Sequence, residues 1–194
     1  GGKNHWISGI FLQSEQKNRN GRIYPKSILA KQVERYTNEA IVNKRAIGEL
    51  NHPSHPEPNP ERASHLITSL KESGNDWVGR AKVLNTPMGN IVKGLLDDGV
   101  QLGVSSRGLG SLKESNGLKV VQEDYYLSTI DIVSNPSAPA AFVNGLMEGV
   151  EWIWENDSLI QRKLEVIKEK IEKIIKPSEK DLCEMFELYI NGLR

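Results

Sequence analysis

Hydrophobic and polar positions in the first half of the chain form short stretches typical of strands, interrupted by one long stretch with helical spacing. Residues 6–12 are apolar enough for a first strand, and residues 64–72 and 76–84 predict a hairpin around Ser73, Gly74 and Asn75. Between residues 27 and 42 the apolar side chains recur about every 3.6 positions, which predicts a helix with one buried face. The pattern is therefore one of strands with a helix inserted between them.

The same alternation continues to about residue 133. A short helix is predicted over residues 90–96 and a strand over residues 101–107. A second hairpin is predicted to pair residues 109–114 with 118–133 across the turn at 115–117. Many short strands with two helices between them indicate an α+β fold, which we expect to be a small, mostly antiparallel β-barrel flanked by helices.

The pattern changes after residue 148. Apolar residues then recur at spacings of four, three, four and three, with Lys and Glu between them, as in one face of a coiled-coil helix: Ile160, Leu164, Ile167, Ile171 and Ile174. The chain is therefore divided into a core, residues 1–148, and a helical C-terminal extension, residues 149–194. The extension either packs on the core as a helical hairpin or binds a partner helix or another subunit, and the pattern leaves both interpretations open.

Composition narrows the classes of partner. The chain has 194 residues, of which 25 are Lys or Arg and 25 are Asp or Glu, so it lacks the basic excess of a nucleic-acid-coating surface. No apolar run approaches the roughly 20 residues that cross a bilayer, so no membrane span is expected. The single cysteine, Cys183, excludes a disulfide framework and fits a reducing cytoplasm.

Candidate chemistry gathers around the glycine-rich run at residues 103–110, which holds Ser105 and Ser106 just after an apolar stretch. A serine hydroxyl becomes a nucleophile when a base removes its proton and N–H donors hold the oxyanion that forms. His52 stands at the entry of a proline-rich loop, and Asp131 lies within an otherwise apolar or hydroxyl-bearing strand. Serine, histidine and aspartate in rigid settings are the components of a hydrolytic triad, although only geometry defines one.

Five blocks of sequence resemble, in the same order, the prohead (procapsid maturation) proteases of T4-like tailed bacteriophages. They are 9–11, 18–25, 48–53, 103–111 and 135–139. The resemblance covers about residues 6–145, and this family is similar in fold and mechanism to the herpesvirus capsid-maturation protease. It implies a herpesvirus-protease-like core, a serine endopeptidase activity and no cofactor.

The resemblance also implies roles for individual residues. Neighbouring side chains on a strand face opposite ways, so Ser105 and Ser106 cannot both face one cleft, and the family block selects Ser105 as the nucleophile. The block at 48–53 fits His52 as the general base, and Asp131 is expected to orient its imidazole. The backbone N–H groups of Ser106 and Arg107 are the candidate oxyanion donors.

Three alternatives are weighed against this triad. His55 and His65 compete with His52, and the herpesvirus enzymes use a second histidine as third member. Glu49, His52, His55 and His65 together permit a zinc-site hypothesis, but the prolines after His52 prevent a helix from placing two of them on one face, so no metal is expected. The alternative function is a non-catalytic assembly protein on the same fold, which would pack into a ring and bind scaffold.

The expected substrates are phage scaffold and core proteins and the major capsid protein, cleaved inside the assembling prohead in the host cytoplasm. The family is expected to cleave after glutamate with Ile or Leu two residues before it. Such a site occurs at Leu146-Met147-Glu148-Gly149, between core and extension, so we expect self-cleavage between Glu148 and Gly149. Before this cleavage, the extension would keep the enzyme inactive as a zymogen. A dimer and a ring are both compatible with the resemblance. Four cations are candidates for a glutamate pocket: Arg62, Arg80, Lys82 and Arg107.

Overall fold

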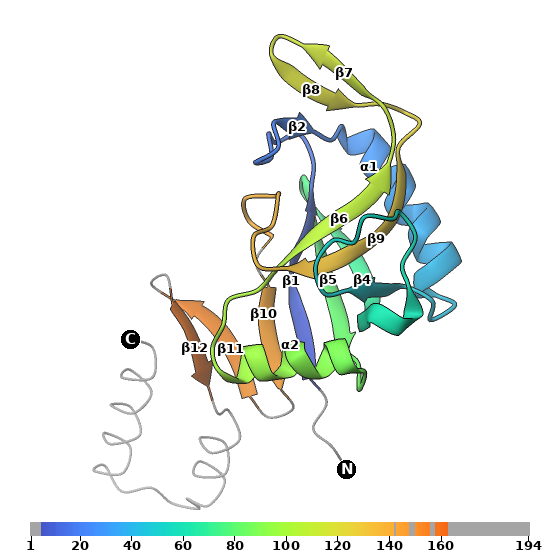
Figure 1. Ribbon diagram of the computed structural model, residues 1–194. Coiled ribbons are helices and arrows are strands. Elements are labelled where there is room, and N and C mark those ends of the chain that lie inside the picture. Colours follow the sequence, from blue (N-terminus) through green and yellow to red (C-terminus); the bar gives the residue numbers. More distant parts are fainter. Residues whose placement is uncertain (1–4, 142, 148–149, 156–157, 163–194) are drawn as a thin grey trace, which may run out of the picture.

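A seven-stranded antiparallel sheet forms the frame of the computed structural model, which describes residues 5–141, 143–147, 150–155 and 158–162 (Figure 1). Its strand order is β12-β11-β10-β1-β5-β4-β3. The strands are β1 (His5–Gln13), β3 (Ile47–Glu49), β4 (Ala63–Ser73), β5 (Asp76–Val83), β10 (Val143–Met147), β11 (Val150–Glu155) and β12 (Ser158–Arg162). The predicted hairpin is confirmed as β4–β5, and the predicted first strand is the central strand β1.

Two helices pack against this frame where the sequence predicts them. α1 (Lys26–Tyr36) continues as a π-helical turn, Thr37–Ile41, and buries one face that includes Leu29 and Val33. α2 (Pro87–Asp97) begins at Thr86, whose hydroxyl accepts the Gly89 N–H at 3.1 Å. A proline in the first helical turn and a hydroxyl cap are the usual start signals of a helix.

Two smaller sheets complete the structure. β6 (Gly103–Leu109) pairs with β9 (Tyr126–Val133) as an antiparallel ribbon, and β2 (Arg22–Ile23), β8 (Leu118–Val121) and β7 (Leu112–Ser115) form the order β2-β8-β7. In Figure 1 the β6–β9 ribbon crosses in front of β1, β5 and β4, with α1 along one side and α2 across the lower end. The β7–β8 hairpin projects beyond the rest of the fold.

The core lies between the frame, α1 and the β6–β9 ribbon. Period-two alternation on the strands and the apolar face of α1 meet there, which removes the large apolar side chains from water. The largest fully buried side chains include Trp77, Phe11, Ile7, Leu29, Ile67, Leu127, Ile130 and Ile132. The apolar face of the ribbon packs against the frame, and polar side chains lie on its other face.

The structure confirms the α+β class and corrects three details of the prediction. The hydrogen-bonded pairings of the described residues form three sheets, one of which contains the parallel pair β2–β8, and do not close a single barrel. The predicted strand 118–133 is divided at a turn, so β8 pairs with β7 whereas β9 pairs with β6. Residues 150–155 and 158–162, expected to begin a helical extension, are strands, and most of the heptad pattern lies outside the described residues.

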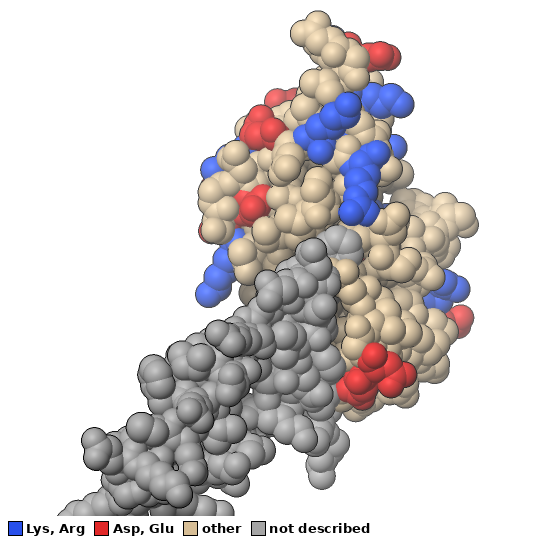
Figure 2. Space-filling model, turned by 90° about the vertical axis from the view of Figure 1, so that its left-hand side faces the viewer, with Lys and Arg blue, Asp and Glu red and all other residues tan. Residues whose placement is uncertain are grey.

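The surface is mixed in charge. On the coloured part of the face shown in Figure 2, Lys and Arg are interspersed with Asp and Glu, in keeping with equal numbers of the two kinds in the sequence. No helix in the described part of the chain is long and apolar enough to cross a membrane.

Candidate active site

The β6–β9 ribbon presents three of the candidate residues on one face. Ser105 lies directly opposite Asp131 in the ladder, and Arg107 lies opposite Thr129. Because side chains alternate along a strand and directly opposed residues share a face, Ser105, Arg107 and Asp131 project together while Ser106 and Ile130 project to the other side. The ladder therefore separates the two serines that sequence alone could not distinguish.

His52 reaches this face from the end of β3. Leu50 forms a bridge to Ile132 of β9, and the Asn51 N–H donates to the Ile132 carbonyl at 2.8 Å. Asn51 has a φ of 66°, a left-handed conformation that asparagine tolerates better than most residues, and it turns the chain toward the ribbon. His52 Nδ1 then lies 2.8 Å from Asp131 Oδ2. Its side chain is 40% exposed, whereas that of Asp131 is completely buried.

Asp131 is held as a carboxylate by four hydrogen bonds. Its Oδ2 accepts from His52 Nδ1 and from Arg107 Nε, both at 2.8 Å, and its Oδ1 accepts from Arg107 Nη2 and the Glu49 N–H, both at 3.0 Å. Burial by itself raises the pKa of Asp131, but the hydrogen bonds from His52, Arg107 and the Glu49 amide outweigh burial and bring that pKa below its usual value. An ionised acceptor requires the proton on His52 Nδ1, which leaves Nε2 unprotonated in the neutral ring.

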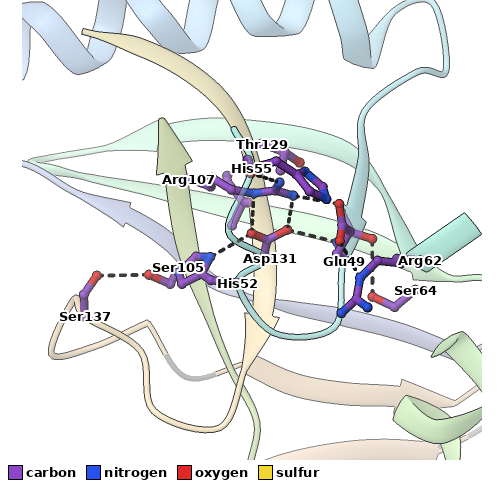
Figure 3. A network of polar contacts seen from close by, with 12 residues as sticks. Glu49, His52, His55, Arg62, Ser64, Ser105, Arg107, Thr129, Asp131 and Ser137 are labelled. Carbon is purple, nitrogen blue, oxygen red and sulfur yellow. Dashed lines mark hydrogen bonds and ion pairs between the residues drawn. The ribbon is translucent and has the colours of Figure 1, made fainter. Parts of the chain in front are cut away.

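Ser105 lies next to a pocket and is almost completely buried. Its Oγ is 3.0 Å from Ser137 Oγ, on the segment that follows β9 (Figure 3). The adjoining pocket is lined by Ser105, Ser106 and Ser137 together with residues of β1 and the loop after it, Gln13, Gln16 and Asn18 among them. Among the described residues, no hydrogen bond joins Ser105 to His52; the two are related through Asp131, which lies opposite Ser105 in the ladder and is 2.8 Å from His52 Nδ1.

The two oxyanion candidates point in different directions. The Val104 N–H donates to the Ala141 carbonyl at 2.8 Å and therefore faces away from β9. Since backbone N–H groups alternate between the two edges of a strand, the Ser106 N–H also faces away from β9 whereas the Arg107 N–H faces the ladder. Of the two candidates, the Ser106 N–H therefore lies on the edge of β6 that does not pair with β9, and the pocket is lined by residues of this strand.

The competing histidines have other partners. His65 is completely buried, with Nε2 2.9 Å from the Ile130 carbonyl and Nδ1 2.9 Å from Ser64 Oγ, and burial lowers its pKa to about 4. Gly48 packs on this ring, since a Cβ there would lie 2.3 Å from His65 Nε2. His55 Nδ1 lies 2.7 Å from the Glu57 carbonyl. The described residues contain no group of three or more His, Cys, Asp and Glu side chains arranged to hold a metal ion.

Sequence reasoning missed how Glu49 and Arg107 take part. Glu49 is fully buried, and Arg107 is engaged through its side chain rather than its backbone. A signal was available, because Arg107 stands two positions after Ser105 and must share its face if Ser105 faces a carboxylate. Glu148 and Gly149, the expected self-cleavage site, lie outside the described residues.

The chain matches known proteins over most of this region. The family model described as "Prohead core protein serine protease" matches residues 2–151. The prohead core protein protease of Enterobacteria phage T4 is 44% identical over an alignment of 147 residues, and the match covers 71% of this chain and 67% of that protein. The solved structure of the bacteriophage T4 capsid assembly protease aligns with a TM-score of 0.65 at 42% identity, covering 66% of this chain and 80% of that one.

Proposed function

Because the chain belongs to the family of prohead core serine proteases, which act in phage capsid assembly, we propose that Ser105, His52 and Asp131 are its catalytic triad. One observation carries this assignment. The buried Asp131 carboxylate is 2.8 Å from His52 Nδ1 and lies directly across the ladder from Ser105. A carboxylate, an imidazole and a hydroxyl in this order are the groups that acyl transfer requires.

The first half of the reaction makes an acyl-enzyme. The Ser105 hydroxyl turns about its Cα–Cβ bond from Ser137 toward His52, whose Nε2 is free because Asp131 keeps the proton on Nδ1. Ser105 Oγ bonds to the carbonyl carbon of the substrate while its proton moves to Nε2, and the carbonyl oxygen becomes an oxyanion. The carbon–nitrogen bond then breaks as His52 returns the proton to the departing amine.

The second half repeats these proton transfers with water. His52 Nε2 takes a proton from a water molecule, the oxygen of which attacks the ester carbon, and then returns it to Ser105 Oγ as the ester bond breaks. The Ser106 N–H on the open edge of β6 supports the oxyanion in both halves. The Arg107 N–H is the weaker candidate, because it faces β9.

A pocket beside the nucleophile supports the proposed preference for glutamate. Gln16 and Asn18 are among its lining residues, and the NH2 group of an Asn or Gln side chain can donate to a carboxylate. Two of the expected cations are engaged elsewhere, since Arg107 binds Asp131 and Arg62 Nε binds Glu49 at 3.1 Å. Arg80 and Lys82 are the other two cationic candidates, and Gln16 and Asn18 are proposed beside them as neutral donors.

The proposed substrates are scaffold and shell proteins inside the assembling prohead, and one proposed site is in this chain. The proposed bond joins Glu148 to Gly149, which follow β10 in the sequence. Mass spectrometry of the chain incubated under conditions in which a scaffold substrate is cut should then show a product ending at Glu148, and a chain that stays intact would exclude this site.

The triad is tested by cleavage of a peptide containing Ile-x-Glu-Ala, with Ser105→Ala and Ser106→Ala as a matched pair. Loss of about 10³-fold or more in kcat/KM in Ser105→Ala alone supports the assignment. Loss in Ser106→Ala alone would move the nucleophile to that residue. A chain that neither cleaves peptide nor reacts at Ser105 with a serine-directed reagent would favour the non-catalytic assembly protein.

A further inference from the structure

Two buried charges beside the proposed triad have no role in the proton transfers. Glu49 is fully buried and Arg107 is 7% exposed, and they are joined by Arg107 Nη2 and Glu49 Oε1 at 3.1 Å. A buried charge is costly unless it is paired and hydrogen-bonded, so their partners indicate what the charges hold in position.

Arg107 contacts both the proposed acid and the loop that carries the proposed base. Its Nε and Nη2 bind the two oxygens of Asp131, and its Nη1 donates to the carbonyls of His55 at 2.8 Å and Glu57 at 3.1 Å (Figure 3). A planar guanidinium presents N–H groups in a fixed fork, which makes such a two-point contact with a carboxylate directional. The guanidinium of Arg107 on β6 thereby binds both Asp131 and residues 52–59, which we call the His52 loop.

Glu49 binds the C-terminal end of the same loop, at Asn59. Its Oε1 accepts the Asn59 N–H at 2.7 Å as well as Arg107, and its Oε2 accepts Arg62 Nε. The loop between these contacts contains Pro53, Pro56 and Pro58, which limit its conformations but supply no N–H groups for anchoring. Beyond Asn51 and His52, which contact β9 directly, the loop is therefore attached to the ribbon through Arg107 and Glu49.

We propose that Arg107 is a positioning residue, with Glu49 as its counter-charge, and that it holds the His52 loop against Asp131 in the geometry that proton transfer needs. The proposal rests on the triad proposed above. It assigns Arg107 a contribution through His52 and Asp131 only, with no contact to substrate. It also explains why a cation two positions from the nucleophile is unavailable to a glutamate side chain.

The charge of Arg107 and its fork shape are separated by two variants. Arg107→Lys keeps the charge but loses the fork, so kcat is expected to fall about 10- to 100-fold at nearly unchanged KM, because small misplacement of a catalytic group is costly. Arg107→Gln also removes the charge that faces Asp131. The groups that remain around Asp131 are His52 and Glu49 beside it, Arg62 beyond Glu49, His65 on β4 and Tyr36 on α1.

Without the guanidinium, the negative charge of Asp131 holds a proton on the His52–Asp131 pair more strongly. The acid limb of the kcat/KM profile of Arg107→Gln should therefore move to higher pH by about one unit, whereas that of Arg107→Lys should stay in place. The matched control is Arg35→Lys, because Arg35 Nη2 also donates to the ribbon, at the Leu127 carbonyl, but lies outside the site. Equal losses in Arg107→Lys and Arg35→Lys, each in proportion to lost stability, would overturn the proposal.

A readout that needs no activity separates this proposal from the triad proposal. In a Ser105→Ala background, hydrogen exchange of the Asn59 amide reports the anchoring of the loop. Arg107→Lys is expected to accelerate this exchange at least tenfold, whereas Arg35→Lys should leave it unchanged. Equal exchange in both variants would overturn the proposal that Arg107 holds the loop in place. If Arg107→Lys fails to fold, Glu49→Gln tests the same tie with the arginine in place, and undiminished protection of Asn59 there would count against it. An inactive parent with normal exchange would instead count against the triad.

Discussion

The β6–β9 ribbon and the β7–β8 hairpin are both antiparallel pairs from one continuous stretch of chain, but their side chains have opposite surroundings. Nearly every residue of β9 is buried, and Ser105, Arg107 and Asp131 lie within the ribbon, whereas all four residues of β7 are exposed. The ribbon is covered by the frame on one face and by the His52 loop on the other. The hairpin projects away from both (Figure 1).

This difference shows that burial by neighbouring elements, rather than the pairing of the strands, decides whether a charged side chain contributes to the structure. Lys113, Glu114 and Lys119 on the hairpin are solvated, so their charges contribute little to the fold. Arg107 and Asp131 on the ribbon are out of water and must hold each other, which fixes their atoms in one arrangement. Substitutions within the ribbon should therefore have much larger effects than substitutions on the hairpin.

The largest effect is expected for Asp131→Asn. The amide cannot hold the proton on His52 Nδ1 as a carboxylate does and loses its ion pair with Arg107, so kcat should fall by about 10²- to 10⁴-fold. The matched control is Asp124→Asn on the exposed turn before β9, where the carboxylate accepts hydrogen bonds from Ser111, and its activity should stay within about twofold of the parent. Peptide cleavage measures both, and comparable losses would remove the contrast between buried and solvated carboxylates.

The pH dependence of stability tests the buried side of the ribbon. His65 has a folded-state pKa of about 4 against 6.5 in the unfolded chain, so the unfolded state binds more protons between these values and stability falls as the pH falls from 6.5 to 4. The loss amounts to about 3 kcal/mol at the lower end of the window. The lowered pKa of Asp131 adds a further loss below about pH 4, as its carboxylate is protonated.

Urea unfolding at a series of pH values measures this slope. His65→Gln should flatten the curve between pH 6.5 and 4, because the titrating group is gone. An unchanged slope in His65→Gln would show that other groups produce the dependence.

A pair of glycines compares close packing with open space. A Cβ on Gly48 would lie 2.3 Å from both the His65 ring and the Ile130 carbonyl, so Gly48→Ala should cost about 1–3 kcal/mol. A Cβ on Gly94 in α2 meets nothing within 4 Å, and Gly94→Ala should stabilise the protein by about 0.5–1 kcal/mol through helix propensity. Thermal unfolding measures both, and changes of the same sign would contradict the packing around His65.

The smallest effect is expected on the projecting hairpin. Lys113→Thr replaces one exposed residue of β7 with another that suits a strand, so the free energy of unfolding should change by less than about 0.5 kcal/mol and peptide cleavage should be unaffected. A large loss of cleavage here would mean that the hairpin contacts substrate. The hairpin and the ribbon would then differ in solvent exposure but not in their importance for cleavage.

Much of the architecture was predictable because it is local. The β4–β5 turn, the apolar face of α1 and the proline and threonine that start α2 are all encoded within a few residues. The division of the predicted strand 118–133 was missed because nothing in its residue types says that β8 pairs with β7 and β9 with β6. Residues 150–155 were assigned to the helical extension because of the heptad spacing that starts at Ile160, and pairing with β10 makes them strand β11 instead.

The candidate site divides in the same way. The sequence by itself determined the residue types, the family and the rule that Ser105 and Ser106 face opposite ways, whereas the ladder showed which of them shares a face with Asp131. Only the tertiary structure decided that Asp131 meets His52, 79 positions away, and that Arg107 and Glu49, 58 positions apart, join them. The physical reason is that a buried carboxylate takes whichever donors the fold brings to it, and those donors come from strands and loops far apart in the chain.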